Sequence, residues 1–86
     1  MDSENSEIKW IWTFYERTPD GARVARFVID EREYKSSAEM RVVVSEAVSE
    51  LNKRRIVGEN EERPVTARDR VSNLPRWPEY RSLLEQ

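Results

Sequence analysis

Carboxylates are the main side chains of this sequence that could perform acid–base chemistry, because the chain contains no histidine and no cysteine. That absence excludes zinc fingers, thiol nucleophiles, Ser-His-Asp triads and disulfide frameworks. Glu61 and Glu62 lie in a polar stretch, and Glu46 and Glu50 lie on the polar side of an expected helix. None of these acids has the neighbours that would form a catalytic pocket. We therefore predict a protein that is not an enzyme and that holds no metal or other cofactor.

Basic and aromatic side chains alternate in the first half of the chain and offer a second kind of chemistry. The basic residues are Lys9, Arg17, Arg23, Arg26, Arg32 and Lys35, and the aromatic ones are Trp10, Trp12, Tyr15 and Phe27. A β-ribbon of this composition could enter the major groove of DNA, where arginines reach guanine edges and phosphates. The alternative is that the aromatic residues are core and the arginines pair with nearby acids.

Two segments rich in aromatic and β-branched residues, 8–16 and 22–30, are expected to be strands. Between them, Thr18-Pro19-Asp20-Gly21 supplies a proline for a type I turn and a glycine for a backbone position with positive φ. We therefore predict a β-hairpin over residues 8–30, closed by a short loop with a glycine bulge.

Pairing of Thr18 with Ala22 would decide which side chains share a face. One face then carries Trp10, Trp12, Phe14, Val24, Arg26 and Val28, and the other carries Ile11, Thr13, Tyr15, Ala25, Phe27 and Ile29. A shift by one residue would exchange the faces of the second strand. Since both faces hold large apolar groups, we expect one to be an exposed aromatic surface or to be covered by the C-terminal segment. Residues 31–35 either extend the ribbon or add a short third strand.

A capping box over residues 36–39, Ser-Ser-Ala-Glu, predicts the start of a helix. Apolar residues then recur at spacings of three and four, forming a single stripe: Met40, Val43, Val44, Ala47, Val48 and Leu51. This stripe predicts one long amphipathic helix over 36–56 that packs on the hairpin. Lys53, Arg54 and Arg55 fall in its last turn, where the helix dipole favours cations, and Gly58 follows as a stop.

The C-terminal part is expected to be a helical segment over residues 66–86. Residues 58–63 are interpreted as an acidic loop, after which Thr66 could cap a short helix through Asp69 with Val71 and Leu74 as its apolar contacts. Pro78 is placed as the first residue of a terminal helix. Trp77 is then either a plug for the core or an anchor for a partner, and the plug is the favoured interpretation.

A chain of 86 residues corresponds to one small domain. We predict an α+β fold over residues 8–86, in which the hairpin, possibly part of a three-stranded antiparallel sheet, packs on the long helix. Residues 1–7 are an acidic leader that we expect to be disordered; it carries a charge of −3 and leaves +1 on the rest. No apolar run is long enough to span a membrane and no secretory signal is visible, so we expect a cytoplasmic protein without a membrane partner.

The order of these motifs resembles the N-terminal arm-type, AP2-like DNA-binding domain of phage-type tyrosine recombinases. The resemblance covers residues 9–55 and is carried by W-x-W-x-F-Y-E, T-P-D-G-A-R-V and E-Y-K-S-S-A-E-M-R followed by E-L-N-K-R-R. It implies that the exposed face of the sheet reads DNA in the major groove while the helix packs behind it. The DNA contacts that it implies are Lys9, Trp12, Arg17, Arg23 and Arg26.

Two functions follow as hypotheses. The first is a non-enzymatic module that binds double-stranded DNA through the hairpin, as an integrase-arm-like or accessory protein, with Lys53, Arg54 and Arg55 as possible phosphate contacts. The second is a small phage-like or bacterial protein-interaction module, monomeric or homodimeric, that docks a partner or a second copy through the aromatic ribbon. Convergence of the arginines on one sheet face would favour DNA, whereas arginines interleaved with acids would favour a protein partner.

Overall fold

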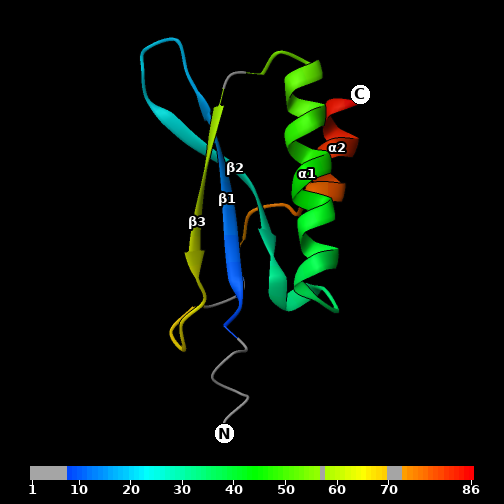
Figure 1. The fold of residues 1–86 in the computed structure, drawn as a ribbon. Helices are drawn as coiled ribbons and strands as arrows, with labels where there is room; N and C mark the ends of the chain where they lie inside the picture. The colour runs from blue at the N-terminus through cyan, green and yellow to red at the C-terminus, as the bar shows by residue number, and fades with distance from the viewer. Residues whose placement is uncertain (1–7, 57, 70–72) are drawn as a thin grey trace, which may run out of the picture.

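A three-stranded antiparallel sheet with two helices on one side forms the fold (Figure 1). The computed structural model describes residues 8–56, 58–69 and 73–86, so the expected leader over 1–7 lies outside the described residues. In chain order the elements are β1 (Trp10–Arg17), β2 (Arg23–Asp30), the 3-10 turn η2 (Glu31–Glu33), α1 (Ser37–Lys53), β3 (Gly58–Pro64) and α2 (Trp77–Leu84). The strand order is β2-β1-β3, which places β1 in the centre. The predicted α+β class is confirmed.

The hairpin between β1 and β2 closes as its turn sequence predicts. The Thr18 N–H donates to the Ala22 carbonyl at 2.9 Å, and Gly21 adopts the positive φ of 91° that glycine accepts without strain. Next to the loop, Tyr15 pairs with Ala25, which is the register expected from Thr18 and Ala22. The turn therefore sets the register of the strand residues nearest to it.

A β-bulge changes that register between Phe14 and Tyr15. Phe14 pairs with Phe27 while Tyr15 pairs with Ala25, so Arg26 is the extra residue on β2. Beyond the bulge the pairing follows the alternative register, shifted by one residue, so β2 exchanges faces there and Phe27 lies on the face of Phe14. The bulge resolves the conflict between the turn and the apolar pattern, since the turn keeps its preferred register while the large side chains still share one face.

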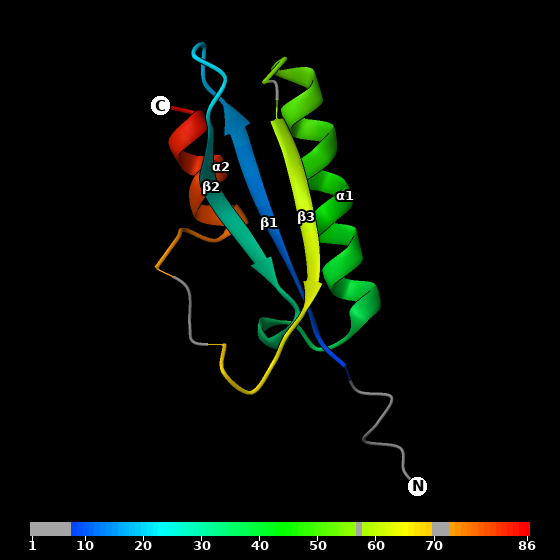
Figure 2. The same ribbon diagram turned by 90° about the vertical axis from the view of Figure 1, so that its left-hand side faces the viewer.

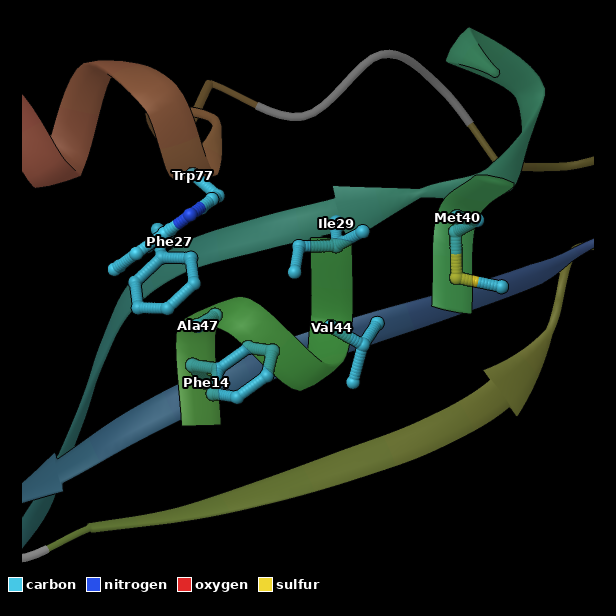
Figure 3. Packing of buried hydrophobic residues seen from close by; sticks show 7 residues of the cluster. All are labelled: Phe14, Phe27, Ile29, Met40, Val44, Ala47 and Trp77. Carbon is cyan, nitrogen blue, oxygen red and sulfur yellow. The ribbon is translucent and has the colours of Figure 1, made fainter. Parts of the chain in front are cut away.

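The core lies between this face of the sheet and the two helices. It consists of Phe14, Phe27, Ile29, Met40, Val44, Ala47 and Trp77 (Figure 3). The rings of Phe14 and Phe27 stack with centroids 4.5 Å apart, and Trp77 contacts Phe27 at 5.2 Å. Trp77 is only 2% exposed, which confirms it as a plug for the core. Burial of this aromatic cluster supplies most of the apolar contact that holds the helices to the sheet.

Helix α1 begins as its cap predicts and ends earlier than the sequence suggests. The Ser36 hydroxyl accepts the Glu39 N–H at 3.1 Å. At the other end Arg55 has a left-handed φ of 57°, and the Ile56 N–H donates to the Leu51 carbonyl at 3.1 Å, as in a Schellman motif. The expected stop at Gly58 is wrong because Arg55 already reverses the chain.

Arg55→Gly is expected to stabilise the protein by about 0.5–1 kcal/mol, because glycine adopts a left-handed φ without the steric cost that a side chain brings. Arg55→Ala is the matched control, since it removes the same charge and keeps the strain. Urea unfolding of both variants measures the difference. Equal stability of the two variants would contradict a strained C-terminus of α1.

Strand β3 occupies the residues that the sequence favours as an acidic loop, so that interpretation is wrong. Its sequence, GENEERP, has no apolar alternation. It forms a strand because β1 offers a complete row of pairing partners, from Trp10 opposite Pro64 to Glu16 opposite Gly58. An edge strand with polar side chains on both faces leaves no periodic signal to read.

The remaining connections also differ in part from expectation. Residues 31–33 form η2, capped by the Asp30 side chain, so they neither extend the ribbon nor add a strand. Thr66 begins a turn in which the Asp69 N–H donates to its carbonyl at 3.1 Å, and Val71 lies outside the described residues. Helix α2 starts at Trp77, with Pro78 in its first turn. The Glu79 carboxylate accepts the backbone N–H of Arg76 at 3.0 Å, which fixes this start.

Candidate functional site

Two of the arginines implied as DNA contacts lie together on the sheet face that points away from the helices. Arg17 and Arg23 are directly opposite each other on β1 and β2. Both guanidinium groups lie 3.4 Å from the Glu59 carboxylate of β3, and Arg23 also stacks over the Tyr15 ring at 4.2 Å. One carboxylate is thus shared between two cations, so it offsets half of their positive charge.

The other three implied contacts lie elsewhere. Arg26 is the bulge residue and pairs with Glu16 at 2.9 Å. Trp12 is half-buried on the helix side, where it packs against the core, so it does not share a face with Arg17. Lys9 precedes β1, and its carbonyl accepts the N–H of Val65 at 2.8 Å. The five side chains therefore do not form one continuous basic surface.

The three candidate phosphate contacts differ in their surroundings. Arg54 pairs with Glu50 at 3.0 Å and donates to the Leu84 carbonyl at 3.2 Å, which ties the end of α1 to the end of α2. Arg55 is the left-handed residue that ends the helix. Lys53 is exposed in the last turn. Arg54 therefore has a structural role that accounts for its position.

Acids accompany most of the remaining arginines in the described ranges. The further pairs are Arg32 with Asp30, Arg63 with Asp69, Arg76 with Glu33, and Arg81 with Glu46 and Glu85. The arginines are thus interleaved with carboxylates. Exposed pairs of this kind add little stability, but they cancel the long-range positive potential that attracts a nucleic acid.

Two of these pairs hold carboxyl groups in their ionised form. Burial raises the pKa of Asp30, but the hydrogen bonds and charge of Arg32 outweigh it and lower that pKa below its ordinary value. Hydrogen bonds from Arg63 and from the Thr66 N–H lower the pKa of Asp69 strongly. Both groups therefore bind a proton less readily in the folded chain than in the unfolded chain.

Acid should therefore destabilise the protein. A folded pKa below the unfolded one contributes stability that is present above the unfolded pKa, about 3.9 for aspartate, and that is lost as pH falls through the folded value. We expect the urea midpoint to fall steadily from about pH 5 to pH 2, and to fall less steeply in Asp30→Asn. A midpoint that stays constant over this range would contradict the assigned pairs.

The two outer edges of the sheet differ in how they are covered. On β2, the Val28 N–H donates to the Pro75 carbonyl at 3.1 Å, and Val28 forms a bridge with Arg76. On β3, the hydrogen bond from the Val65 N–H to the Lys9 carbonyl shows which residues bond to β1. In an antiparallel pair every second residue bonds to the adjacent strand, and the residues between them direct their backbone groups outward. Gly58, Asn60 and Glu62 therefore direct their N–H and C=O groups away from β1.

No other described segment pairs with these outward groups of β3. Pro64 occupies the next outward position, where it has no N–H to offer, so it ends the part of the edge that can pair. An unpaired edge strand is a template for the addition of another strand. The outer edge of β3 from Gly58 to Glu62, here called the β3 edge, therefore offers a row of backbone N–H and C=O groups that pair with no other described segment.

A small groove with a mixed polar and apolar lining adjoins the β3 edge. Its volume is about 70 Å³, and it opens between α1 and the first half of β3. The lining residues are Phe14, Tyr15, Val48, Leu51, Asn52, Ile56 and residues 58–60. Figure 2 shows α1 behind the sheet and extending past the outer edge of β3. A strand added there would lie over α1 rather than in open solvent.

Three carboxylates lie along β3, and they differ in how they are engaged. Glu59 is shared between Arg17 and Arg23 on the face away from the helices. Glu61, on the same face, accepts the Tyr15 hydroxyl at 3.1 Å, and burial together with this hydrogen bond raises the pKa of Tyr15. Glu62 points to the helix side with Trp12 and makes no ion pair within the described ranges. Glu61 and Glu62 therefore bring two negative charges to β3 without forming an ion pair among the described residues.

Comparison with known proteins finds no matching family model, curated protein or solved structure for this chain. The resemblance of residues 9–55 to a recombinase arm domain accordingly stays a prediction. Within the described ranges no three acids lie close enough together to hold a metal ion. None of the described helices is both long enough and apolar enough to cross a membrane.

The sequence hypotheses missed the β3 edge, although a signal for it was present. Charged residues and a proline are the devices by which edge strands avoid uncontrolled pairing. Glu59, Glu61, Glu62 and Pro64 fit that pattern. Interpreting them as a loop placed the binding surface on the aromatic ribbon, whose large side chains the structure turns toward the core.

Proposed function

We propose that this chain is a non-enzymatic protein-interaction module that binds an extended segment of a partner protein along the β3 edge. The observation that carries the proposal is the row of outward N–H and C=O groups at Gly58, Asn60 and Glu62, with α1 extending beyond it. Main-chain hydrogen bonds to a sheet edge supply affinity, and pockets for alternate side chains supply specificity. The β3 edge and the adjoining groove offer both.

The distribution of charge supports a protein partner over duplex DNA. DNA affinity depends on several unpaired cations acting together on phosphates. Here Arg17 and Arg23 share the Glu59 carboxylate, Arg26 pairs with Glu16, and Trp12 is packed against the core. A DNA duplex would have to separate these pairs and would meet the Glu59 carboxylate beside Arg17 and Arg23.

The aromatic ribbon offers less to a partner than the β3 edge does. Phe14 and Phe27 are buried at 3% and 1% exposure, and Trp10 and Trp12 pack against them from the same sheet face. Docking through that face would require the helices to move away. The β3 edge is accessible without any such rearrangement.

Asn60→Pro tests the proposal, because it removes one outward N–H without removing a bond to β1. Asn60→Ala is the matched control, since it keeps that N–H. Peptides selected from a random display library against the unaltered chain serve as probes. We expect Asn60→Pro to weaken their binding by about tenfold or more, which corresponds to about one hydrogen bond to a backbone group, and Asn60→Ala to leave it nearly unchanged.

Circular dichroism of both variants establishes that the sheet is retained. Selected peptides that bind Asn60→Pro as tightly as the unaltered chain would contradict docking at the β3 edge. A labelled DNA duplex forms the second arm of the experiment, at low salt where phosphate contacts dominate. Tight duplex binding that is lost in Arg17→Ala and Arg23→Ala would restore the DNA hypothesis and refute this one.

A further inference from the structure

We infer that the segment bound at the β3 edge is basic, with a lysine or arginine opposite Glu62 and an apolar side chain opposite Asn60 that enters the groove beside α1. This inference rests on the proposed function and specifies its partner. It follows from the charge of β3, the side on which each β3 side chain lies and the position of the groove.

The charge of β3 disfavours acidic occupants. Residues 58–64 carry three glutamates and one arginine, and that arginine, Arg63, already pairs with Asp69 at 2.6 Å. The chain's own segment 1–7 has three acids and no base, so it would be repelled. Like charges placed opposite each other on neighbouring strands are destabilising. A segment with positive charge is the complementary occupant.

A second copy of this chain is also a poor occupant. If two β3 strands paired antiparallel with Asn60 opposite Asn60, Glu59 of each would face Glu61 of the other. Shifting the pairing so that Asn60 lies opposite Glu62 would bring the two Glu61 residues together, and would place Glu59 opposite Arg63, which already pairs with Asp69. Both arrangements place carboxylates opposite each other, which costs free energy for the pair of strands. A basic segment avoids these carboxylate contacts, so it is a better occupant of the β3 edge than a second copy.

The two determinants lie on the same side of the incoming strand. Asn60 is opposite Phe14 and Glu62 is opposite Trp12, so both β3 side chains point to the helix side. Residues two apart on a strand share a face. A partner residue opposite Glu62 and another opposite Asn60 therefore both face α1, which gives the pattern basic-x-apolar in one strand direction and apolar-x-basic in the other.

The groove suits an apolar side chain at the Asn60 end. Phe14, Val48, Leu51 and Ile56 supply its apolar walls, and its volume of about 70 Å³ admits a side chain of aliphatic size. Asn52 stands at its margin on α1 and is exposed. A larger side chain at position 52 would obstruct the groove without entering the core.

The probes are short threonine-rich peptides with an acetylated N-terminus and an amidated C-terminus. Each carries either Lys-Thr-Leu or Leu-Thr-Lys at its centre. Versions with glutamate for lysine, and with serine for leucine, are the controls. Fluorescence anisotropy measures binding to the full chain. We expect the better lysine peptide to bind at least about fivefold more tightly than its glutamate version at low salt, with the difference shrinking as salt is added.

Variants of the chain assign this preference to particular residues. Glu62→Lys should remove or reverse the preference for lysine, and Glu62→Gln, a smaller change, should reduce it. Asn52→Phe should weaken binding of the leucine peptide by about threefold or more and leave the serine peptide unaffected, because it obstructs the groove. Ser49→Phe is the matched control for that change, since Ser49 is exposed on α1 and is not among the residues that line the groove.

The outcomes separate the inference from the proposed function. Equal binding of the lysine and glutamate peptides, with both sensitive to Asn60→Pro, would overturn the basic partner and leave docking at the β3 edge intact. Lysine-dependent binding that is insensitive to Asn60→Pro would overturn the proposed function and this inference together. Loss of the lysine preference in Glu62→Lys together with sensitivity to Asn60→Pro would support both.

Discussion

Trp77→Ala is expected to lower the free energy of unfolding by about 3–5 kcal/mol, the usual cost of removing a buried aromatic side chain. The indole is 2% exposed. Its ring centroid lies 5.2 Å from that of Phe27 and 6.5 Å from that of Tyr80. A domain of this size has a total stability of about 5–15 kcal/mol, so the loss would leave the protein close to unfolding. Urea unfolding followed by circular dichroism measures it without depending on tryptophan emission.

Trp77→Phe is the matched control. Its ring preserves contact with Phe27, and it removes an indole N–H that is buried without a hydrogen-bond partner among the described residues. We expect a loss of about 1–2 kcal/mol, because the missing ring is partly offset by the removal of an unsatisfied donor. A loss below about 1 kcal/mol in Trp77→Ala itself would show that α2 is not part of the cooperative core.

Gly58→Ala is expected to destabilise the protein by about 2–3 kcal/mol, at the upper end of the cost of overpacking. A Cβ atom at position 58 would lie 2.3 Å from the backbone oxygen of Tyr15, which cannot swing aside as a long side chain would. The start of β3 or the end of β1 near Tyr15 must therefore move. Urea unfolding measures the loss of stability. Faster hydrogen exchange of the Glu59 and Glu61 amides would show that the loss arises where β3 pairs with β1.

Asn60→Ala again serves as the comparison, because it adds no atom near β1 and should change stability by less than about 0.5 kcal/mol. The same measurements apply to both variants. A Gly58→Ala protein as stable as Asn60→Ala would mean that β3 does not approach β1 as closely as the structure shows.

Local signals in the sequence predicted the elements whose formation is decided by neighbouring residues. The turn at Thr18 to Gly21, the cap at Ser36 and the apolar stripe of α1 each depend on a few adjacent side chains. Turns, caps and amphipathic stripes have a characteristic spacing for this reason. These elements were sufficient to predict the α+β class.

The bulge and β3 could not be predicted in the same way, because each depends on residues distant in sequence. The bulge at Arg26 follows from the need to place Phe27 against Phe14, which the turn alone would have prevented. Strand β3 depends on β1 for its pairing and has no apolar face of its own. The bulge and β3 determine which groups the sheet exposes. For this reason the sequence indicated the hairpin as the binding surface, whereas the structure favours the β3 edge.

Direct contacts at β3 provide the most decisive measurement. Isotope-labelled protein is titrated with the unlabelled lysine peptide, and cross-strand nuclear Overhauser effects are recorded from the backbone of Asn60 and Glu62. Docking at the β3 edge predicts contacts between these residues and the peptide backbone, together with new protection of their amide hydrogens from exchange. Peptide contacts confined to Arg17, Arg23 and the hairpin loop, with the amides of Asn60 and Glu62 unprotected, would contradict it.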